Sequence, residues 1–509
     1  MAQSRQQISF VSFGDRSLAD VLALDVPPFT SKAEAHRQLE YVEGYVRDLD
    51  CHSLVVEDHY IDRDHMEDHS VFYSKSLQPY PNACRRVHFF SCDSAVLKRE
   101  LKRLRSTAPP EQFRTESAEF SKRFYLGFTV IKPLPGCPVG RTILRCFAAD
   151  ADKGYLRNFS CACDCRAHLL GVPLSIRGLA FQQQDLGVSA CATTALWSAL
   201  QRARELEEGA AATPAQITMR ASQFTLPFGR PMPSEGLSLD QMCQAVHSLG
   251  YAPNLYRADT FDVSRGLLYS AVLSGISPVL IIERGDLWHA VAVAGMKVRR
   301  PHVRNLVYPL MDDRAGDLAA LYIHDDRYGP YLKADIRRKT DNRRKKDRLL
   351  LEIKLRNSSV IERWVLSHLL IPLHPKVRLS FGELQRAAIR LVREIHAHRQ
   401  SILAARETVT SWDCWIGKSH SYVESLILGE NRAPESLIAT LCTTVPFSRY
   451  LGIVRVEADD LDPVDFLLDT TSTERNLHCL ALVRPATSRP QTRDLTELLA
   501  LRYGCSVIG

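Results

Sequence analysis

The sequence has no uninterrupted apolar segment long enough to cross a membrane. A spanning helix needs about 20 consecutive apolar residues, and the nearest approach, 268–282, is broken by serines, a glycine and a proline. The first residues, Met1–Gln7, lack the apolar core of a secretion signal. We therefore expect a cytoplasmic protein with no membrane partner.

The chain also has little excess charge. Its formal net charge is +7 over 509 residues, which leaves room for a local basic patch but is not typical of a nucleic-acid binder. The basic residues concentrate in 331–350. That run has no interleaved aromatic side chains for stacking bases, so we interpret it as a solvated linker and do not expect a nucleic-acid partner.

No cysteine pattern indicates a disulfide framework or a metal site. The 14 cysteines are scattered, and without a secretion signal reduced thiols are expected. Cys161, Cys163, Cys165 and His168 could be zinc ligands, but alternate cysteines also fit one face of a strand, and no second ligand pair follows. The Asp- and His-rich segment 59–69 is interpreted as a solvated helix start with Asp caps. We expect no metal and no cofactor.

The length implies two to four domains. Short β-rich runs mixed with helical periodicity predict the α+β class. We divide the chain into an N-terminal α+β domain at 1–150, a central domain at 151–330, the basic linker at 331–350 and a C-terminal α+β domain at 351–509.

The central domain contains a cysteine placed for nucleophilic chemistry. Apolar residues recur at helical spacing after Cys191, through Ala195, Leu196 and Ala199. Cys191 therefore opens a buried helix, where unpaired backbone N–H groups and the helix dipole favour a thiolate. Three glutamines, Gln182, Gln183 and Gln184, precede it, and an amide from one of them would donate to an oxyanion.

A cysteine nucleophile also needs a base and a group that orients the base. His289 follows a tight turn and begins a strand whose small residues, at 290–294, leave room for the Cys191 helix to pack. Asp325 ends a later strand and shares the face of Ile323 by period-two alternation. Asp326 is the alternative acid.

These segments resemble the papain-like cysteine peptidases, and are most similar to the bacterial branch that includes the peptidase domains of bacteriocin-processing transporters. The resemblance rests on 184–196, 278–295 and 322–325, within the central third of the chain. It implies a nucleophile helix packed on an antiparallel sheet, with Cys191 as nucleophile, His289 as base and Asp325 as orienting acid. It also implies that Gln184 serves the oxyanion, although the family's usual spacing falls on position 185, which is Asp185 here.

Three functions are compatible with these residues. The first is hydrolysis of a peptide or isopeptide bond in a protein or peptide substrate. The second is acyl transfer of the transglutaminase type, in which an amine replaces water as the second nucleophile. The third is a non-catalytic scaffold of the same fold, with the flanking domains binding a protein partner.

Overall fold

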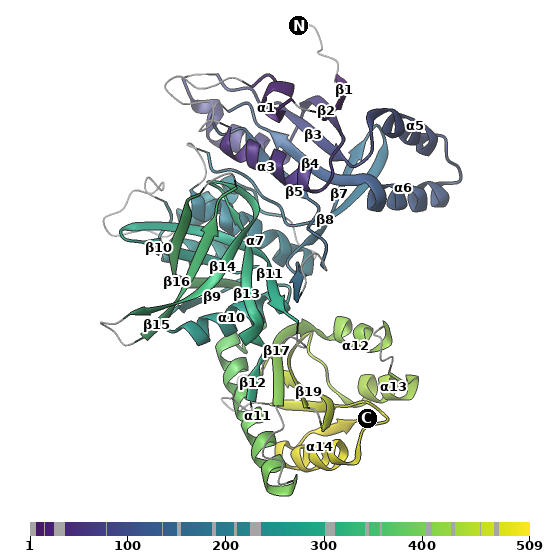
Figure 1. The fold of residues 1–509 in the computed structure, drawn as a ribbon, viewed down its shortest axis with the longest axis vertical. Helices are drawn as coiled ribbons and strands as arrows, with labels where there is room; N and C mark the ends of the chain where they lie inside the picture. The colour runs from purple at the N-terminus through teal and green to yellow at the C-terminus, as the bar shows by residue number, and fades with distance from the viewer. Residues whose placement is uncertain are drawn as a thin grey trace.

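The computed structural model describes residues 7–14, 16–24, 36–77, 79–134, 136–149, 154–185, 190–207, 211–223, 236–300, 311–341, 346–356, 359–403, 410–428, 433–458, 460–472 and 478–509. Helices and strands are mixed along these residues, so the chain is of the α+β class. Figure 1 shows three parts along the long axis, from an N-terminal sheet through a central sheet to a C-terminal sheet. Within the described residues, no helix is both long enough and apolar enough to cross a bilayer.

The N-terminal part is a five-stranded antiparallel sheet in sequence order. Its strands are β1 (Ile8–Ser12), β2 (Ser53–Tyr60), β3 (Cys84–Phe90), β4 (Tyr125–Ile131) and β5 (Val139–Leu144). Its helices are α1 (Leu18–Val21), α3 (Arg37–Asp48), α4 (Arg63–Val71), α5 (Ser94–Arg105) and α6 (Pro110–Phe124), with a short 3-10 turn at Tyr73–Lys75. Buried apolar residues of the sheet and of α3, α5 and α6 form its core.

The Asp- and His-rich segment of this part is buried, which differs from the expected solvated helix start. Asp62 does cap α4, because its carboxylate accepts from the backbone N–H groups of Asp64 and His65. However, Asp64, His65 and Asp68 are all buried. Arg141 of β5 pairs with Asp64 at 2.9 Å, and this cation makes burial of the carboxylate tolerable.

The central part is an antiparallel barrel. Its six strands are β10 (Val279–Arg284), β11 (Leu287–Arg299), β13 (Leu318–Asp325), β14 (Gly329–Asp341), β15 (Lys346–Lys354) and β16 (Ile361–Leu373). β10 pairs with both β11 and β16, and this closes the sheet. Two outer strands, β6 (Tyr155–Asn158) and β9 (Ala252–Arg257), extend β11 and β16. Alternate side chains such as Ile282, Val291 and Ile323 belong to the interior cluster.

Helices cover the outside of the barrel. They are α7 (Cys191–Glu207), α8 (Pro214–Ala221) and α9 (Leu239–Ser248), and a hairpin of β7 (Cys163–Leu169) and β8 (Val172–Gly178) lies beside them. The buried side chains of α10 (Phe261–Leu273) belong instead to the interior cluster of the barrel. α7 packs on the outward-facing Ala290 and Ala292 of β11. The structure therefore places the Cys191 helix where the small residues predicted it.

The basic segment 331–350 is not a linker in the structure. Its described residues, 331–341 and 346–350, form much of β14 and β15, which pair from Ala334↔Ile353 to Asp341↔Lys346, and residues 342–345 lie outside the described part of the chain. Leu349 and Leu351 point into the barrel core, and ion pairs such as Arg337–Glu352 at 3.1 Å neutralise part of the charge. Burial of the alternate leucines thus overrides the charge pattern, and the central part extends to Leu373.

The C-terminal part is a six-stranded sheet ordered β12-β17-β18-β19-β20-β21. Its strands are β12 (Met311–Asp313), β17 (Thr410–Lys418), β18 (Tyr450–Ala458), β19 (Leu461–Asp469), β20 (Cys479–Val483) and β21 (Ser506–Ile508). Its helices are α11 (Phe381–Leu403), α12 (Ser419–Leu428), α13 (Glu435–Thr444) and α14 (Pro490–Tyr503). β12 and the 3-10 turn Arg314–Asp317 come from the link between β11 and β13, so part of that link belongs to the C-terminal sheet.

Candidate active site

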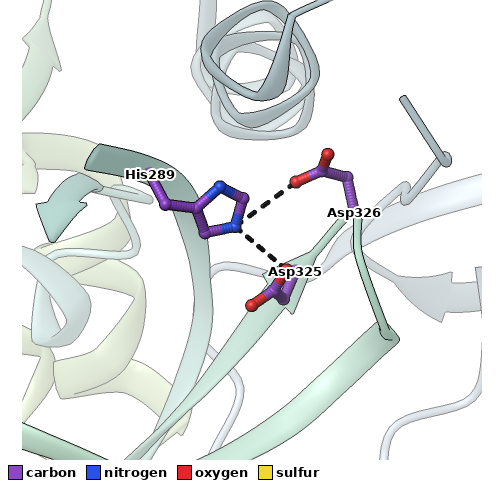
Figure 2. A group of neighbouring side chains, drawn as sticks. All are labelled: His289, Asp325 and Asp326. Atoms are coloured by element: carbon purple, nitrogen blue, oxygen red, sulfur yellow. Dashed lines mark hydrogen bonds and ion pairs between the residues drawn. The ribbon is translucent and has the colours of Figure 1, made fainter. Parts of the chain in front are cut away.

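The candidate site lies at one end of the barrel. The turns that join β10 to β11, β13 to β14 and β15 to β16 all lie at this end, because successive strands of the barrel run antiparallel. His289 is the third residue of β11, and Asp325 is the last residue of β13. Figure 2 shows the His289 ring directed at Asp325 and Asp326, which follow one another at the end of β13. All three side chains are buried.

One nitrogen of His289 contacts both acids. Its Nε2 is 3.0 Å from Oδ1 of Asp325 and 3.5 Å from Oδ1 of Asp326. The shorter contact has hydrogen-bond geometry, so Asp325 is the residue that orients the imidazole. Because Nε2 faces the carboxylates, Nδ1 remains for a reacting group, and Figure 2 shows it directed away from Asp325.

The side chain of Cys191 lies near enough to His289 to contribute to the raised pKa of that histidine. Cys191 is the first residue of α7 and is only partly buried. α7 is fixed against β11 by its apolar face, which brings its first turn to the start of that strand. The structure thus brings together the three residues selected from the sequence, Cys191, His289 and Asp325.

The charges around His289 favour its protonated form. Burial alone would lower the pKa of His289, but attraction to Asp325 and hydrogen bonds with Asp325 and Cys191 raise it above its ordinary value. Burial would raise the pKa of Asp325, yet His289 and Arg327 hold it below its usual range. The pKa of Asp326 is raised, first by burial and then by the adjacent Asp325 carboxylate. A carboxylate–imidazolium pair is the stable state of the site.

Arg327 holds the Asp325 carboxylate through three further hydrogen bonds. Its backbone N–H and Nε donate to Oδ1 at 3.0 and 3.1 Å, and a terminal nitrogen donates to Oδ2 at 2.7 Å. Trp364 lies beside the pair, with its ring centroid 6.1 Å from that of His289. The guanidinium groups of Arg284 and Arg327 lie 4.8 and 4.7 Å from the Trp364 centroid. These residues shield the acid–base pair from water, which strengthens its electrostatic interaction.

The three glutamines before Cys191 differ in what they contact. Residues 181–185 run alongside β5, with two backbone hydrogen bonds between Phe181 and Thr142. Alternation then directs Gln183 toward the N-terminal sheet, where its amide donates to the Gly136 carbonyl and accepts from the Val139 N–H. Gln182 and Gln184 lie on the other side of the segment, which Ala180 shares and which faces α7.

Among the three glutamines, Gln182 has a side-chain N–H donor without an acceptor in the described part of the chain. It is buried, and within the described residues its Nε2 has no hydrogen-bond acceptor. An unsatisfied buried amide is unfavourable by about 1–3 kcal/mol, so an oxygen that accepted from Gln182 Nε2 would be bound favourably. Gln184, the residue implied by the resemblance, is half-buried on the same side.

The same three residues have the geometry of a cation site. His289, Asp325 and Asp326 are the group of described residues whose ligand atoms lie within 4.8 Å of one another. The Asp325 carboxylate, however, already accepts four hydrogen bonds, and the Arg327 guanidinium beside it repels a cation. The residues therefore fit an acid–base pair better than a metal centre. Cys163 and Cys165, considered as zinc ligands, are strand residues of β7.

Removing the Asp325 carboxylate is expected to change how stability depends on pH. The raised pKa of His289 stabilises the fold fully below about pH 6.5 and progressively less as pH rises through the folded value. The lowered pKa of Asp325 stabilises it fully above about pH 3.9, and this is lost as pH falls through the folded value. The melting temperatures of wild type and Asp325→Ala should therefore differ most between about pH 4 and 6.5.

Thermal unfolding of both proteins between pH 3 and 10 measures this difference. Asp326→Ala is the matched control, because Asp326 is the adjacent buried acid but lies farther from Nε2. An Asp325→Ala difference that is constant with pH would show that the His289–Asp325 pair is not the source of the stabilisation.

Several residues of the site carry no sequence signal that selects them. Arg327 lies two residues beyond Asp325 in an ordinary turn, and Trp364 is on a strand distant in sequence. Only closure of the barrel brings Trp364 to His289. A comparison with models of known protein families and with curated protein sequences finds no match to this chain.

Proposed function

We propose that the chain is a cysteine peptidase with a papain-like arrangement, hydrolysing a peptide or isopeptide bond. The observation that carries the proposal is the position of His289, which interacts with the Cys191 side chain and is hydrogen-bonded through Nε2 to the Asp325 carboxylate at 3.0 Å. A nucleophile on a helix end, packed against a sheet that supplies base and acid, is also what the sequence resemblance implies.

Each residue has a defined part in the reaction. In the resting site His289 already holds the Cys191 proton as an imidazolium, and the resulting thiolate attacks the substrate carbonyl to form a tetrahedral intermediate. The imidazolium, held by Asp325, then protonates the departing amine as the C–N bond breaks, leaving an acyl-thioester. His289 next takes a proton from water, which attacks the thioester. The thiol is regenerated as the carboxylic acid leaves.

We assign the oxyanion donor to Gln182, together with the Cys191 backbone N–H. Gln182→Ala is expected to lower kcat by about 10²–10³-fold, the usual effect of losing one oxyanion donor. Alkylation of Cys191 by iodoacetamide should be unchanged, because displacement of iodide creates no oxyanion. Both rates can be measured on the same sample.

Gln184→Ala is the matched control for this experiment. Gln184 is another glutamine on the same side of the segment but is only half-buried. If Gln184→Ala loses kcat and Gln182→Ala does not, the oxyanion donor is Gln184, as the resemblance implies.

Hydrolysis of a quenched fluorescent peptide library tests the proposed activity. Cleaved peptides that disappear in Cys191→Ala support hydrolysis, whereas peptide–amine adducts formed in the presence of added amines would instead indicate acyl transfer. Leu287 and Trp288, which precede His289, are 57% and 56% exposed, so apolar side chains near the base are open to a protein or peptide substrate. The absence of any cleavage or transfer would favour a binding scaffold, with the flanking parts contacting a protein partner.

A further inference from the structure

A buried ion pair connects the N-terminal sheet to the segment that leads to Cys191. Nζ of Lys132, which follows β4, lies 3.5 Å from Oδ2 of Asp185. The two side chains are only 3% and 2% exposed. Asp185 occupies the position at which the resembling family has its glutamine, yet its carboxylate faces the N-terminal sheet rather than α7. Its role is therefore different from that of an oxyanion donor.

Other groups of the N-terminal part reinforce this contact. The Tyr73 hydroxyl is hydrogen-bonded to Asp185. Burial alone would lower the pKa of Lys132, but Asp185 and Asp68 raise it, so the ammonium stays charged. Burial raises the pKa of Asp68 well above its ordinary value. Asp68 also accepts from the Ala215 N–H of α8 at 3.1 Å.

The Lys132–Asp185 ion pair is one of three contacts that alternate residues of 181–185 make with the N-terminal sheet. Phe181, Gln183 and Asp185 are directed at the N-terminal sheet, and each is fixed there by a backbone pairing, an amide pair or an ion pair. Gln182 and Gln184 consequently face α7. Lys132 holds Asp185, the residue of these three that is nearest to Cys191 in sequence.

We infer that Lys132 is a positioning residue of the proposed active site, acting through Asp185 to hold the segment that presents Gln182 toward Cys191. This inference rests on the proposed peptidase function. It gives the N-terminal part an indirect role in catalysis, through the position of Gln182. α7 itself is held by its packing on β11, so loss of Lys132 should displace the oxyanion donor while the Cys191–His289 contact remains.

The test compares two rates in the full chain of Lys132→Met, Asp185→Asn and the double variant. Peptide hydrolysis needs the oxyanion donor, whereas alkylation of Cys191 by iodoacetamide does not. Each single variant is expected to lose about 10- to 100-fold in kcat, the effect of a misplacement of about 1 Å. KM should change less than about threefold, and alkylation should stay within about twofold. The double variant should be no slower than the singles, because both side chains act through one contact.

Arg399→Met provides the matched control. Arg399 is also 3% exposed and pairs with Asp460, and both residues belong to the C-terminal part rather than to the N-terminal part or the barrel. This variant should lose thermal stability with kcat unchanged. A wild-type kcat in Lys132→Met would overturn the inference, as would equal losses in hydrolysis and alkylation, which indicate general destabilisation. If wild type hydrolyses no peptide while its Cys191 is alkylated, the proposed function fails and the positioning role fails with it.

Discussion

Replacing Cys191 with alanine is expected to lower peptide hydrolysis by about 10⁴-fold or more, the usual consequence of removing a nucleophile that acts as a unit with its base. The thiol supplies the bond-forming atom, and the described residues place no second cysteine against His289. The fold should survive, because Cys191 is only partly buried at a helix start and the substitution removes one sulfur atom.

Labelling with a thiol-directed electrophile followed by peptide mapping checks this result. Mapping is required because all 14 cysteines are free. Cys442→Ala is the matched control, since Cys442 is an exposed thiol on α13. Wild type and Cys442→Ala should hydrolyse at the same rate, with Cys191 the fastest residue to be labelled. Hydrolysis by Cys191→Ala at the wild-type rate would remove the basis of the mechanism.

Replacing His289 with alanine is expected to have a similarly large effect, about 10⁴-fold or more in kcat/KM. The imidazole both forms the thiolate and protonates the leaving amine, so no other group of the site substitutes for it. The substitution also leaves a space beside Asp325 in which a free imidazole molecule can bind. Added imidazole should therefore restore part of the activity of His289→Ala but should not stimulate Cys191→Ala.

The pH profile separates this role from a structural one. Because the pKa of His289 is raised, the imidazolium persists above about pH 6.5, and the alkaline decline of wild-type kcat/KM should lie above that value. In the rescued variant the decline should move toward the pKa of free imidazole. His420→Ala, which removes an exposed histidine of α12, should leave the profile unchanged. An unshifted profile on rescue would contradict the assignment of His289 as base.

Local sequence patterns were sufficient for several parts of the site. The helical spacing of Ala195, Leu196 and Ala199 predicted a helix beginning at Cys191, and α7 begins there. The small residues after His289 predicted a strand on which that helix packs, and Ala290 and Ala292 provide this surface. These features follow from periodicity and side-chain size, which short segments determine by themselves.

The same patterns were insufficient wherever the outcome depended on distant partners. The run of basic residues in 331–350 indicated a linker, but barrel closure buries its alternate leucines and makes it a hairpin. Three similar glutamines could not be distinguished until the N-terminal sheet was seen to engage Gln183 and Asp185. The order of residues around Asp325 gave no reason to select Arg327.

The sequence by itself thus determined the α+β class and the residue types and local elements from which a cysteine–histidine–acid site can be built, because those depend on periodicity and on intrinsic side-chain chemistry. Only the tertiary structure decided that the three residues meet, that Asp325 rather than Asp326 makes the shorter contact with Nε2, and that the Gln182 amide donor has no acceptor among the described residues. Those outcomes depend on strand pairings between distant residues and on which buried charges find partners, and no short segment encodes either.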